Sequence, residues 1–483
     1  MEQVKLDPKT EGHGSVPVTG DPFVDMGALV MDTLPQESIE NKIRFATDAY
    51  VDLWKSKLHD VFLHSKLTHI SLSSKPEAQR KGALEYYLGL LSDRHKVTDG
   101  FCRVCAESGP LFNAERSNFP MVGSGEFTNF HHFHEPSLLL CKTCLIRLYF
   151  LPLGLLQLHQ RKRGGNLMML QIQNQYTREY WKQEVILKNL DRISRGSSEG
   201  MLTFGYTQPQ NALFKLASGL IRRFDLYDTP AQRVRLFCFS NFGPTPDLSI
   251  HDLPNRVFSF LQRVMKPDLR QDWGYFIRRH YRLRKTGYQF DTSTGDWYEI
   301  QKEGKTRMES GEYEGNRANT VYDWLLSGKS ILSLLRAVHK SRPFSIHIAI
   351  AYLKEVKKMR QEQINTIRSI SEKIILLAQK TGGDYKHYLT PIEGARYAFQ
   401  LRGALIRMAK AYLKNKGEEP FIRFNDYVEY LFPDGQSWYE VRDLLLICLY
   451  EKLHELSIDP GNLSDQPVAE VEETEVTTIE SQF

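Results

Sequence analysis

The spacing of apolar and polar residues predicts that this chain is mostly helical. Apolar side chains recur every three or four positions, as on amphipathic helices, over residues 38–65, 76–91, 178–193, 210–227 and 252–265. Two short apolar runs, 166–172 and 234–239, are instead typical of buried strands. The opening stretch 19–31 is interpreted as tight turns around a short strand, and Asp25 as a cap for the next element rather than a catalytic acid.

Beyond residue 320 the helical pattern becomes nearly continuous, over residues 321–339, 343–380, 391–416 and 438–456. The polar, glycine-rich segment 291–319 before it is expected to form an irregular hairpin or a mobile loop. The prediction is an α+β, mostly helical chain in four parts. These are a mobile N-terminus (1–18), an α+β domain (19–320) with an insertion at about 100–147, a helical bundle (321–458), and an acidic disordered tail (459–483).

Four of the six cysteines form two C-x-x-C pairs, Cys102 with Cys105 and Cys141 with Cys144. Two residues between thiolates let one chain reach two corners of a tetrahedron, so the four side chains are predicted to bind zinc. Two redox disulfides are the weaker alternative, because a redox C-x-x-C normally occurs once, at the start of a helix. A zinc ion with four protein ligands keeps no open position for water, so its role would be structural.

Three histidines, at positions 131, 132 and 134, lie shortly before the second cysteine pair and can in principle replace a thiolate. Because four cysteines already complete the shell, loop or partner contacts are the preferred interpretation. The isolated Cys238 and Cys448 are expected to be packed thiols.

The formal charge of +5 understates the basic character of the chain, because residues 459–483 hold seven acids and no Lys or Arg. Residues 341–416 alone contain fifteen Lys or Arg against five Asp or Glu. Such an excess favours a polyanionic partner. The candidate phosphate contacts in this region are Lys357, Lys358 and Arg360.

The densest basic run is Arg278, Arg279, Arg282, Arg284 and Lys285, interleaved with aromatic residues from Tyr275 to Tyr288. Arginine offers bidentate phosphate contacts and aromatic rings offer stacking surfaces, so the run is predicted to bind nucleic acid. A solvated helix face is the alternative. Asn316, Arg317 and Asn319 are candidates for contacts with base edges, as is the segment 123–129.

No phosphate-binding, dinucleotide-binding or nucleophile-elbow motif is present, so the sequence does not indicate an enzyme. The first ten residues carry acids and no apolar core, which argues against a signal peptide, and the longest apolar run is broken by charged residues and proline. With few cysteines outside the two pairs, a reducing cytoplasm is the expected compartment.

The opening Thr19-Gly20-Asp21-Pro22-Phe23-Val24-Asp25-x-Gly27, the paired cysteines and the basic helical C-terminal part together resemble the large subunit of type I-B CRISPR Cascade complexes. The resemblance implies a non-catalytic subunit of a prokaryotic antiviral complex that binds the crRNA 5′ region. It further implies recognition of the protospacer-adjacent motif on double-stranded target DNA, stabilisation of the R-loop with its displaced strand, and recruitment of a nuclease-helicase. The implied partners are a crRNA-capping subunit, a backbone subunit and small subunits, and the resemblance implies that the helical bundle 321–458 is itself similar to a small subunit.

Two other classes remain open: a zinc-ribbon protein that binds or modifies RNA alone, and a pure scaffold. The first needs a catalytic or cofactor motif, and the second does not need the basic stretch. In relatives of type I-B the small subunit comes from a translation start inside the large-subunit gene. Met359, preceded by Lys354-Glu355-Val356-Lys357-Lys358, is the preferred internal start here, with Met308 as its rival.

Overall fold

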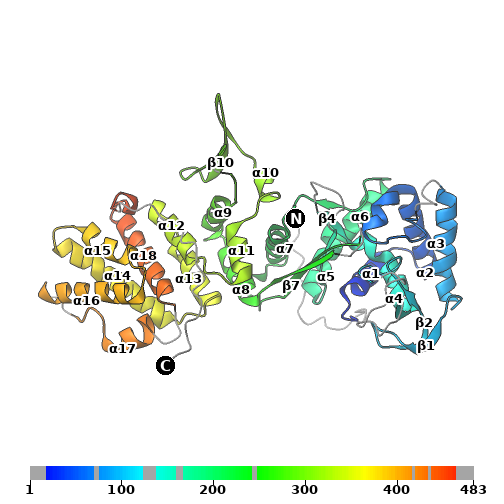
Figure 1. The fold of residues 1–483 in the computed structure, drawn as a ribbon, viewed down its shortest axis with the longest axis horizontal. Coiled ribbons are helices and arrows are strands. Elements are labelled where there is room, and N and C mark those ends of the chain that lie inside the picture. Colours follow the sequence, from blue (N-terminus) through cyan, green and yellow to red (C-terminus); the bar gives the residue numbers. More distant parts are fainter. Residues whose placement is uncertain are drawn as a thin grey trace, which may run out of the picture. The chain divides into compact units, whose positions relative to one another are not determined.

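The computed structural model describes residues 18–69, 75–122, 137–158, 167–241, 247–284, 286–415, 419–432 and 437–463. These form two compact units. The N-terminal unit comprises Met1–Phe258, Tyr281–Leu283 and Met308–Leu326, and the C-terminal unit comprises Ser259–His280, Arg284–Arg307 and Ser327–Phe483. The chain passes between the units several times between Ser259 and Ser327, whereas the sequence-based interpretation put one border at residues 320 and 321. Helices predominate and three sheets are present, so the predicted α+β, mostly helical class is confirmed (Figure 1).

The N-terminal unit begins with helix α1 (Pro22–Thr33), so the predicted strand in this stretch is wrong. The Asp21 carboxylate accepts hydrogen bonds from the Phe23 and Val24 amides, both at 2.9 Å, and Pro22 occupies the first helical turn. Asp-Pro therefore starts a helix here instead of making a turn. Asp25 is not the cap either: its carboxylate accepts from the Thr19 amide (2.7 Å) and hydroxyl (2.8 Å), which fixes the segment before the helix.

Further helices of this unit cover most of the segments expected to be helical. They are α2 (Ile39–Asp48), continued by π- and 3-10-helical turns to Asp60, α3 (Pro76–Leu91), α4 (Lys142–Phe150), α5 (Gln175–Trp181), α6 (Leu187–Ser194), α7 (Pro209–Arg223), α10 (Ser310–Glu314) and α11 (Thr320–Ser327). The single long helix predicted over 38–65 is thus divided, and Lys55 has a positive φ of 46° at the division.

Two sheets lie in the N-terminal unit. A small antiparallel sheet has the order β1-β2-β3, with β1 (Thr98–Phe101), β2 (Ser108–Ala114) and β3 (Leu138–Cys141). A five-stranded sheet has the order β6-β4-β5-β7-β8, with β4 (Leu156–Leu158), β5 (Leu167–Leu170), β6 (Thr203–Phe204), β7 (Val234–Ser240) and β8 (Asp247–Leu253). Strands β5 and β7 confirm the two predicted apolar strands. Strand β8 was not predicted, because its exposed positions leave no apolar run in the sequence.

The C-terminal unit combines helix α9 (Arg270–Arg279), a three-stranded meander and a helical bundle. The meander, β9 (Tyr288–Asp291), β10 (Asp296–Gln301) and β11 (Gly304–Arg307), forms the regular part of the segment expected to be irregular. Helix α8 (Asn255–Val264) begins in the other unit. The bundle contains α12 (Leu332–Ser341), α13 (Ile346–Glu355), α14 (Gln361–Lys380), α15 (Tyr385–Glu393), α16 (Ala398–Lys414), α17 (Phe424–Asp426) and α18 (Trp438–Glu455).

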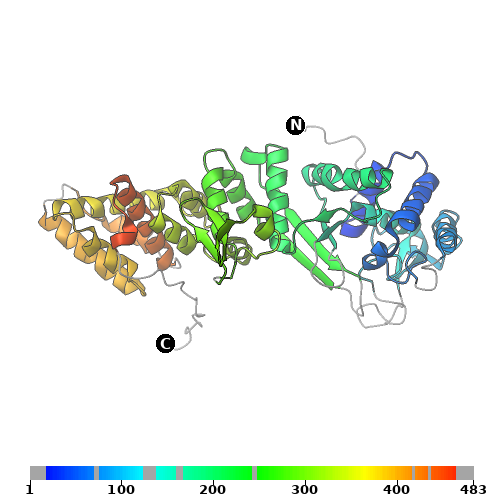
Figure 2. The same ribbon diagram turned by 90° about the horizontal axis from the view of Figure 1, so that it is seen from above.

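Helix α18 forms the centre of the bundle. Its apolar side chains are buried on all sides. The helix packs against α12, α13, α14 and α15, and its ribbon lies among theirs in Figures 1 and 2. A buried ion pair connects it to α12, since Arg336 contacts Asp443 at 2.6 Å and the Asp443 side chain is only 3% exposed. Lys340 of α12 similarly contacts Glu393 of α15 at 3.0 Å.

The bundle helices are shorter than predicted, because breaks interrupt three of the long patterns, two of them at left-handed backbone positions. Gly328 (φ 78°) lies between α11 and α12, and Lys358 (φ 56°) lies between α13 and α14. A further break separates α15 from α16. Among the helices that the structure describes, none is both long and apolar enough to cross a bilayer.

Candidate metal centre and basic surfaces

The first cysteine pair occupies a tight turn between β1 and β2. The Cys102 amide donates to the Glu107 carbonyl (2.9 Å), and the Ala106 amide donates to the Cys102 carbonyl (2.9 Å). Ala106 adopts a left-handed φ of 60°, which lets the chain reverse directly after the second cysteine. The Arg103 amide also donates to the Leu139 carbonyl (3.1 Å), so this turn is anchored to β3.

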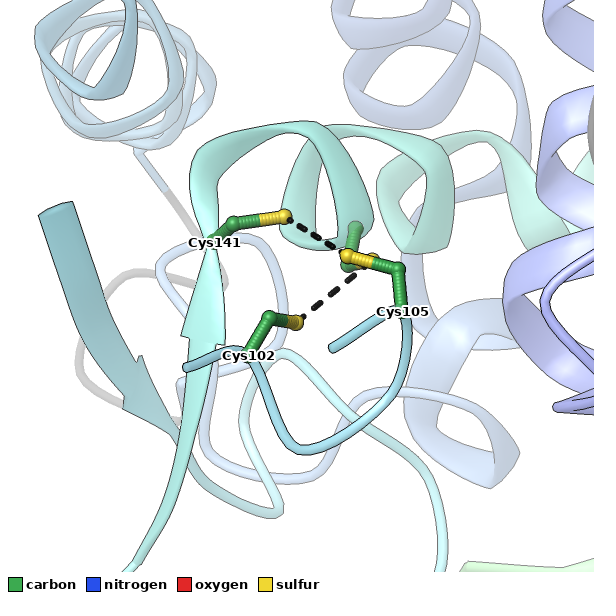
Figure 3. A group of neighbouring side chains, drawn as sticks. Cys102, Cys105 and Cys141 are labelled. Atoms are coloured by element: carbon green, nitrogen blue, oxygen red, sulfur yellow. Dashed lines mark hydrogen bonds between the residues drawn. The ribbon is translucent and has the colours of Figure 1, made fainter. Parts of the chain in front are cut away.

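The second pair spans the junction of a strand and a helix. Cys141 ends β3, paired with Leu111 of β2, and Cys144 lies in the first turn of α4. Because one pair lies at a hairpin end and the other at a helix start, four side chains converge from two directions (Figure 3).

The four sulfur atoms lie within 4.8 Å of one another. The Sγ atoms of Cys102 and Cys144 are 3.8 Å apart, and those of Cys105 and Cys141 are 3.6 Å apart. A tetrahedral ion with metal–sulfur bonds of about 2.3 Å places its sulfurs about 3.8 Å apart, so these distances fit a metal ion. They are far too long for disulfides, and all six cysteines are free thiols.

The thiols influence one another's ionisation. Hydrogen bonding with Cys141 and Cys144 lowers the pKa of Cys102, and hydrogen bonding with Cys102 raises the pKa of Cys141 to about 12 and also raises the pKa of Cys144. A cluster of this kind stabilises one thiolate among neutral thiols. A divalent cation reverses this preference, since it stabilises several thiolates together and displaces their protons.

Helix α4 connects the cysteine cluster to the core of the N-terminal unit. It packs against α1 so closely that a Cβ atom on Gly27 would lie 1.8 Å from the Arg147 carbonyl oxygen. The Tyr149 hydroxyl lies 2.7 Å from the Thr47 hydroxyl, and the Tyr50 hydroxyl donates to the Tyr149 carbonyl (2.8 Å). On the other side, the Lys142 ammonium contacts Asp93 at 3.0 Å. The cluster is therefore part of a packed assembly with α1, α2 and α3.

Of the other sequence-predicted candidates near this site, His131, His132, His134 and the segment 123–129 lie outside the described residues. Among the residues that the structure describes, the four cysteines are the one group of three or more metal-binding side chains that can share an ion. Cys238 and Cys448 are buried, as expected of packed thiols.

The aromatic residues of the basic run point into the protein. Tyr275, Phe276 and Tyr281 are at most 6% exposed, and burial lowers the pKa of His280 to about 4. The Tyr275 ring packs against Phe290 and Phe344, with centroids 5.6 and 6.3 Å away. These rings are core side chains, so the expectation that they form a stacking surface for bases is wrong in this structure.

The arginines of the run differ in their surroundings. Arg278 donates to the Gly295 carbonyl (2.9 Å), and Arg279 donates to the Ser341 hydroxyl (2.7 Å). Arg282 contacts Asp323 at 3.0 Å. Arg284 is exposed and makes no hydrogen bond or ion pair with any described residue, and Lys285 lies outside the described part. Residues 281–283 belong to the N-terminal unit and the rest of the run to the C-terminal unit, so the run is not one continuous helix face.

The second set of predicted phosphate contacts lies between α13 and α14. Lys357 contacts Glu440 of α18 at 2.5 Å. Burial acts to lower the pKa of Lys357, but Glu440 and the neighbouring Tyr352 and Tyr439 together leave it raised. Lys358 is exposed, and Arg360 lies over the Tyr430 ring at 5.1 Å. Met359 is 7% exposed and precedes the first residue of α14 by two positions, so it does not lie inside a long helix as assumed.

The three candidates for contacts with base edges, Asn316, Arg317 and Asn319, differ in their burial. Asn319 is fully buried and caps α11, since its side-chain oxygen accepts from the Val321 amide at 3.0 Å. A side chain in this position cannot reach a base, so its predicted role is wrong in this structure. Asn316 and Arg317 are half-buried, and the Arg317 carbonyl accepts from the Asn211 side chain at 2.8 Å.

A basic and aromatic surface that the sequence analysis did not single out lies on α16. Tyr397 and Phe399 are 60% and 69% exposed at its start, and residues 396–414 contain five Lys or Arg and no acid. The signal that can reveal it is the seven-residue spacing of Phe399, Ile406 and Leu413 beside these cations.

Comparison of the chain with family models, with curated proteins and with solved structures finds no match.

Proposed function

We propose that the four cysteines hold one structural zinc ion. Four sulfur donors at tetrahedral spacing suit zinc, and a complete protein shell leaves no position for a water or substrate ligand. The ion would join the β1–β2 turn to the start of α4 and thereby stabilise the N-terminal unit.

Elemental analysis of freshly purified protein tests this proposal. We expect about one zinc per chain, and the double variant Cys102→Ser/Cys141→Ser is expected to lose both the metal and the folded state of this region. Cys238→Ala, a buried thiol outside the cluster, is the matched control and should retain the metal. Iron in place of zinc, or full folding of the double variant without metal, would contradict the proposal.

We further propose that the chain is the non-catalytic large subunit of a type I-B CRISPR Cascade complex. One observation carries this proposal: two of the three sequence features on which the resemblance depends lie on helices that are in direct contact. The Thr19–Gly27 motif forms the start of α1, and its Gly27 allows the close approach to α4, the helix that carries Cys144. The Thr19–Gly27 motif and the helix that carries Cys144 therefore form one structural module. Packing explains these contacts without a catalytic role for the motif.

In this proposal the chain binds the crRNA 5′ region and double-stranded target DNA together with the capping, backbone and small subunits, and takes part in recruiting the nuclease-helicase. The exposed cations Lys358, Arg360 and Arg284 support contacts with phosphates. Exposed charges of this kind are compatible with the alternative as well, a zinc-ribbon protein that binds or modifies RNA alone.

Purification of the tagged chain from its source cells, followed by sequencing of the bound RNA, separates the two functions. A Cascade subunit should bring down repeat-derived short guide RNAs and several other subunits. Cellular RNAs without repeat sequence, bound to the chain alone, would contradict the Cascade proposal and favour the alternative. A matched sample from cells lacking the CRISPR array controls for adventitious RNA.

An internal start at Met359 remains part of this proposal. A product of residues 359–483 would contain α14–α18 but lack α12, whose Arg336 pairs with the buried Asp443. Met308 as the start would retain α12. Immunoblotting for a C-terminal tag, with Met359→Leu and Met308→Leu genes side by side, decides between them. A short product that persists at unchanged size in both variants, or that never occurs, would contradict internal initiation at these positions.

A further inference from the structure

Helix α16 has an exposed face with unusual chemistry. It packs against α14, α15 and α18, and Figure 1 shows it at the edge of the bundle. On its other side Phe399, Ile406 and Leu413 are 69%, 51% and 66% exposed. A spacing of seven residues aligns these side chains along one line, about 21 Å long.

The aromatic end of this face is a flat and well-fixed surface. The rings of Tyr397 and Phe399 are nearly parallel, with an interplanar angle of 8° and centroids 5.7 Å apart. The Gln400 side chain accepts hydrogen bonds from the backbone amides of Arg396 (2.7 Å) and Tyr397 (3.3 Å). The backbone that carries the rings is therefore held in place before any ligand arrives, which lowers the entropy cost of binding.

Most cations of this face are available to a ligand, whereas the Arg402 guanidinium lies over the Phe432 ring at 4.7 Å. All are exposed, and none forms an ion pair with a residue that the structure describes: Arg396, Arg402, Arg407, Lys410 and Lys414. On a helical projection Lys410 lies on the apolar line, between Ile406 and Leu413. A cation in the middle of an apolar stripe is unfavourable against a lipid core or a second apolar helix, because its charge would lose water without a partner. Against a phosphate backbone it is favourable.

We propose that this face binds a single strand of nucleic acid, with unpaired bases stacked on Tyr397 and Phe399 and phosphates along the cations of α16. Bases in a duplex are already stacked on one another, so exposed rings gain contacts mainly with unpaired bases. The inference rests on the proposed nucleic-acid function of the chain and adds to it the class of ligand and the residues that bind it.

Fluorescence anisotropy of the full-length chain with a labelled single-stranded oligonucleotide, and with a blunt duplex of equal length, tests the inference. Tyr397→Ala/Phe399→Ala should weaken single-strand binding at least about tenfold and leave the salt dependence unchanged. Arg407→Gln/Lys410→Gln should reduce the slope of log K against log salt by about 1.4, because two phosphate contacts are lost.

Two controls make the result specific. Phe424→Ala removes an exposed ring of the same unit, 79% exposed and without a ring contact to any described residue, and should change affinity less than about twofold. The exchange variant Tyr397→Phe/Phe399→Tyr keeps both rings and should bind the single strand about as tightly as the wild type. Circular dichroism of each variant verifies the fold.

Unchanged affinity in the double alanine variant would overturn the inference. So would equal losses for the single strand and the duplex, or a change confined to the oligomeric state or to binding of anionic lipid vesicles. The Cascade proposal stands apart from this outcome. If Tyr397→Ala/Phe399→Ala loses single-strand binding, the binding site on α16 is supported even when no guide RNA is found with the chain in cells. If guide RNA is found but this variant binds the single strand normally, only the Cascade proposal is supported.

Discussion

Residues 275–284 and 396–414 have similar compositions, with arginines and aromatic rings side by side, yet the protein uses them in opposite ways. In the first segment the rings of Tyr275 and Phe276 are buried, and Arg278 is hydrogen-bonded to a backbone carbonyl. In the second the rings of Tyr397 and Phe399 are exposed and stacked, and the cations have no ion-pair partner among the described residues. Composition indicates which chemistry is present, but burial decides whether a ligand can reach it.

The largest expected difference concerns stability. Phe276→Ala removes a fully buried ring and is expected to lower the free energy of unfolding by about 3–5 kcal/mol. Phe399→Ala removes an exposed ring and should change it by less than about 0.5 kcal/mol. Urea denaturation monitored by circular dichroism measures both, and equal costs for the two variants would mean that the contrast between the segments does not hold.

A second difference appears on acidification. Burial lowers the pKa of His339 in α12 to about 3 and that of His280 to about 4, so both are neutral in the folded state. Below the ordinary histidine pKa of about 6.5 the unfolded chain binds protons that the folded chain does not, so stability falls as the pH falls from about 6.5 toward 3. Residues 396–414 contain no His, Asp or Glu, so strand binding should stay constant until the bundle unfolds.

Thermal denaturation between pH 7 and pH 4 measures this loss. His339→Leu should flatten the dependence, whereas the exposed His347→Gln, as the matched control, should leave it unchanged. A pH dependence that is the same in all three proteins would exclude the buried histidine as its source.

The smallest expected effect concerns the arginines of the first segment. Arg284→Gln should lower the salt slope of nucleic-acid binding by about 0.7 to 0.9, the value of one phosphate contact. Arg278→Gln should leave the slope unchanged and cost about 1 kcal/mol of stability, because it loses the hydrogen bond to Gly295. Anisotropy titrations at three or more salt concentrations compare the two variants, and an equal slope change in both would show that Arg278 also binds phosphate.

Local signals in the sequence predicted some features well. The four cysteines were found from their spacing, because two residues between thiolates suffice to place two ligands on one ion, whatever the rest of the chain does. Helix α3 was predicted with its observed bounds, from an uninterrupted periodic pattern that starts at Pro76.

Other features depend on contacts that no local pattern contains. Asp21-Pro22 is equally suited to a turn and to the start of a helix, and packing of α1 on α4 stabilises the helix. Asn319 has the side chain of a base-contacting residue, but a buried helix N-terminus makes it a cap. The break at Lys358 has no proline or glycine to indicate it, so α13 and α14 were predicted as one helix.

The contact between Gly27 and the Arg147 carbonyl also has a consequence for how the chain folds during synthesis. Helix α1 leaves the ribosome early, but the surface that accepts its glycine exists only after both cysteine pairs have emerged and α4 has formed. Until then Phe23, Val24 and Met26 of α1, which are buried in the folded protein, stay exposed to solvent. Contacts between residues so distant in sequence also form slowly. With the proposed zinc ion at the four cysteines, scarcity of metal during synthesis would extend this interval. The amount of folded protein should then depend on metal supply while the chain is being made, and less on metal added afterwards.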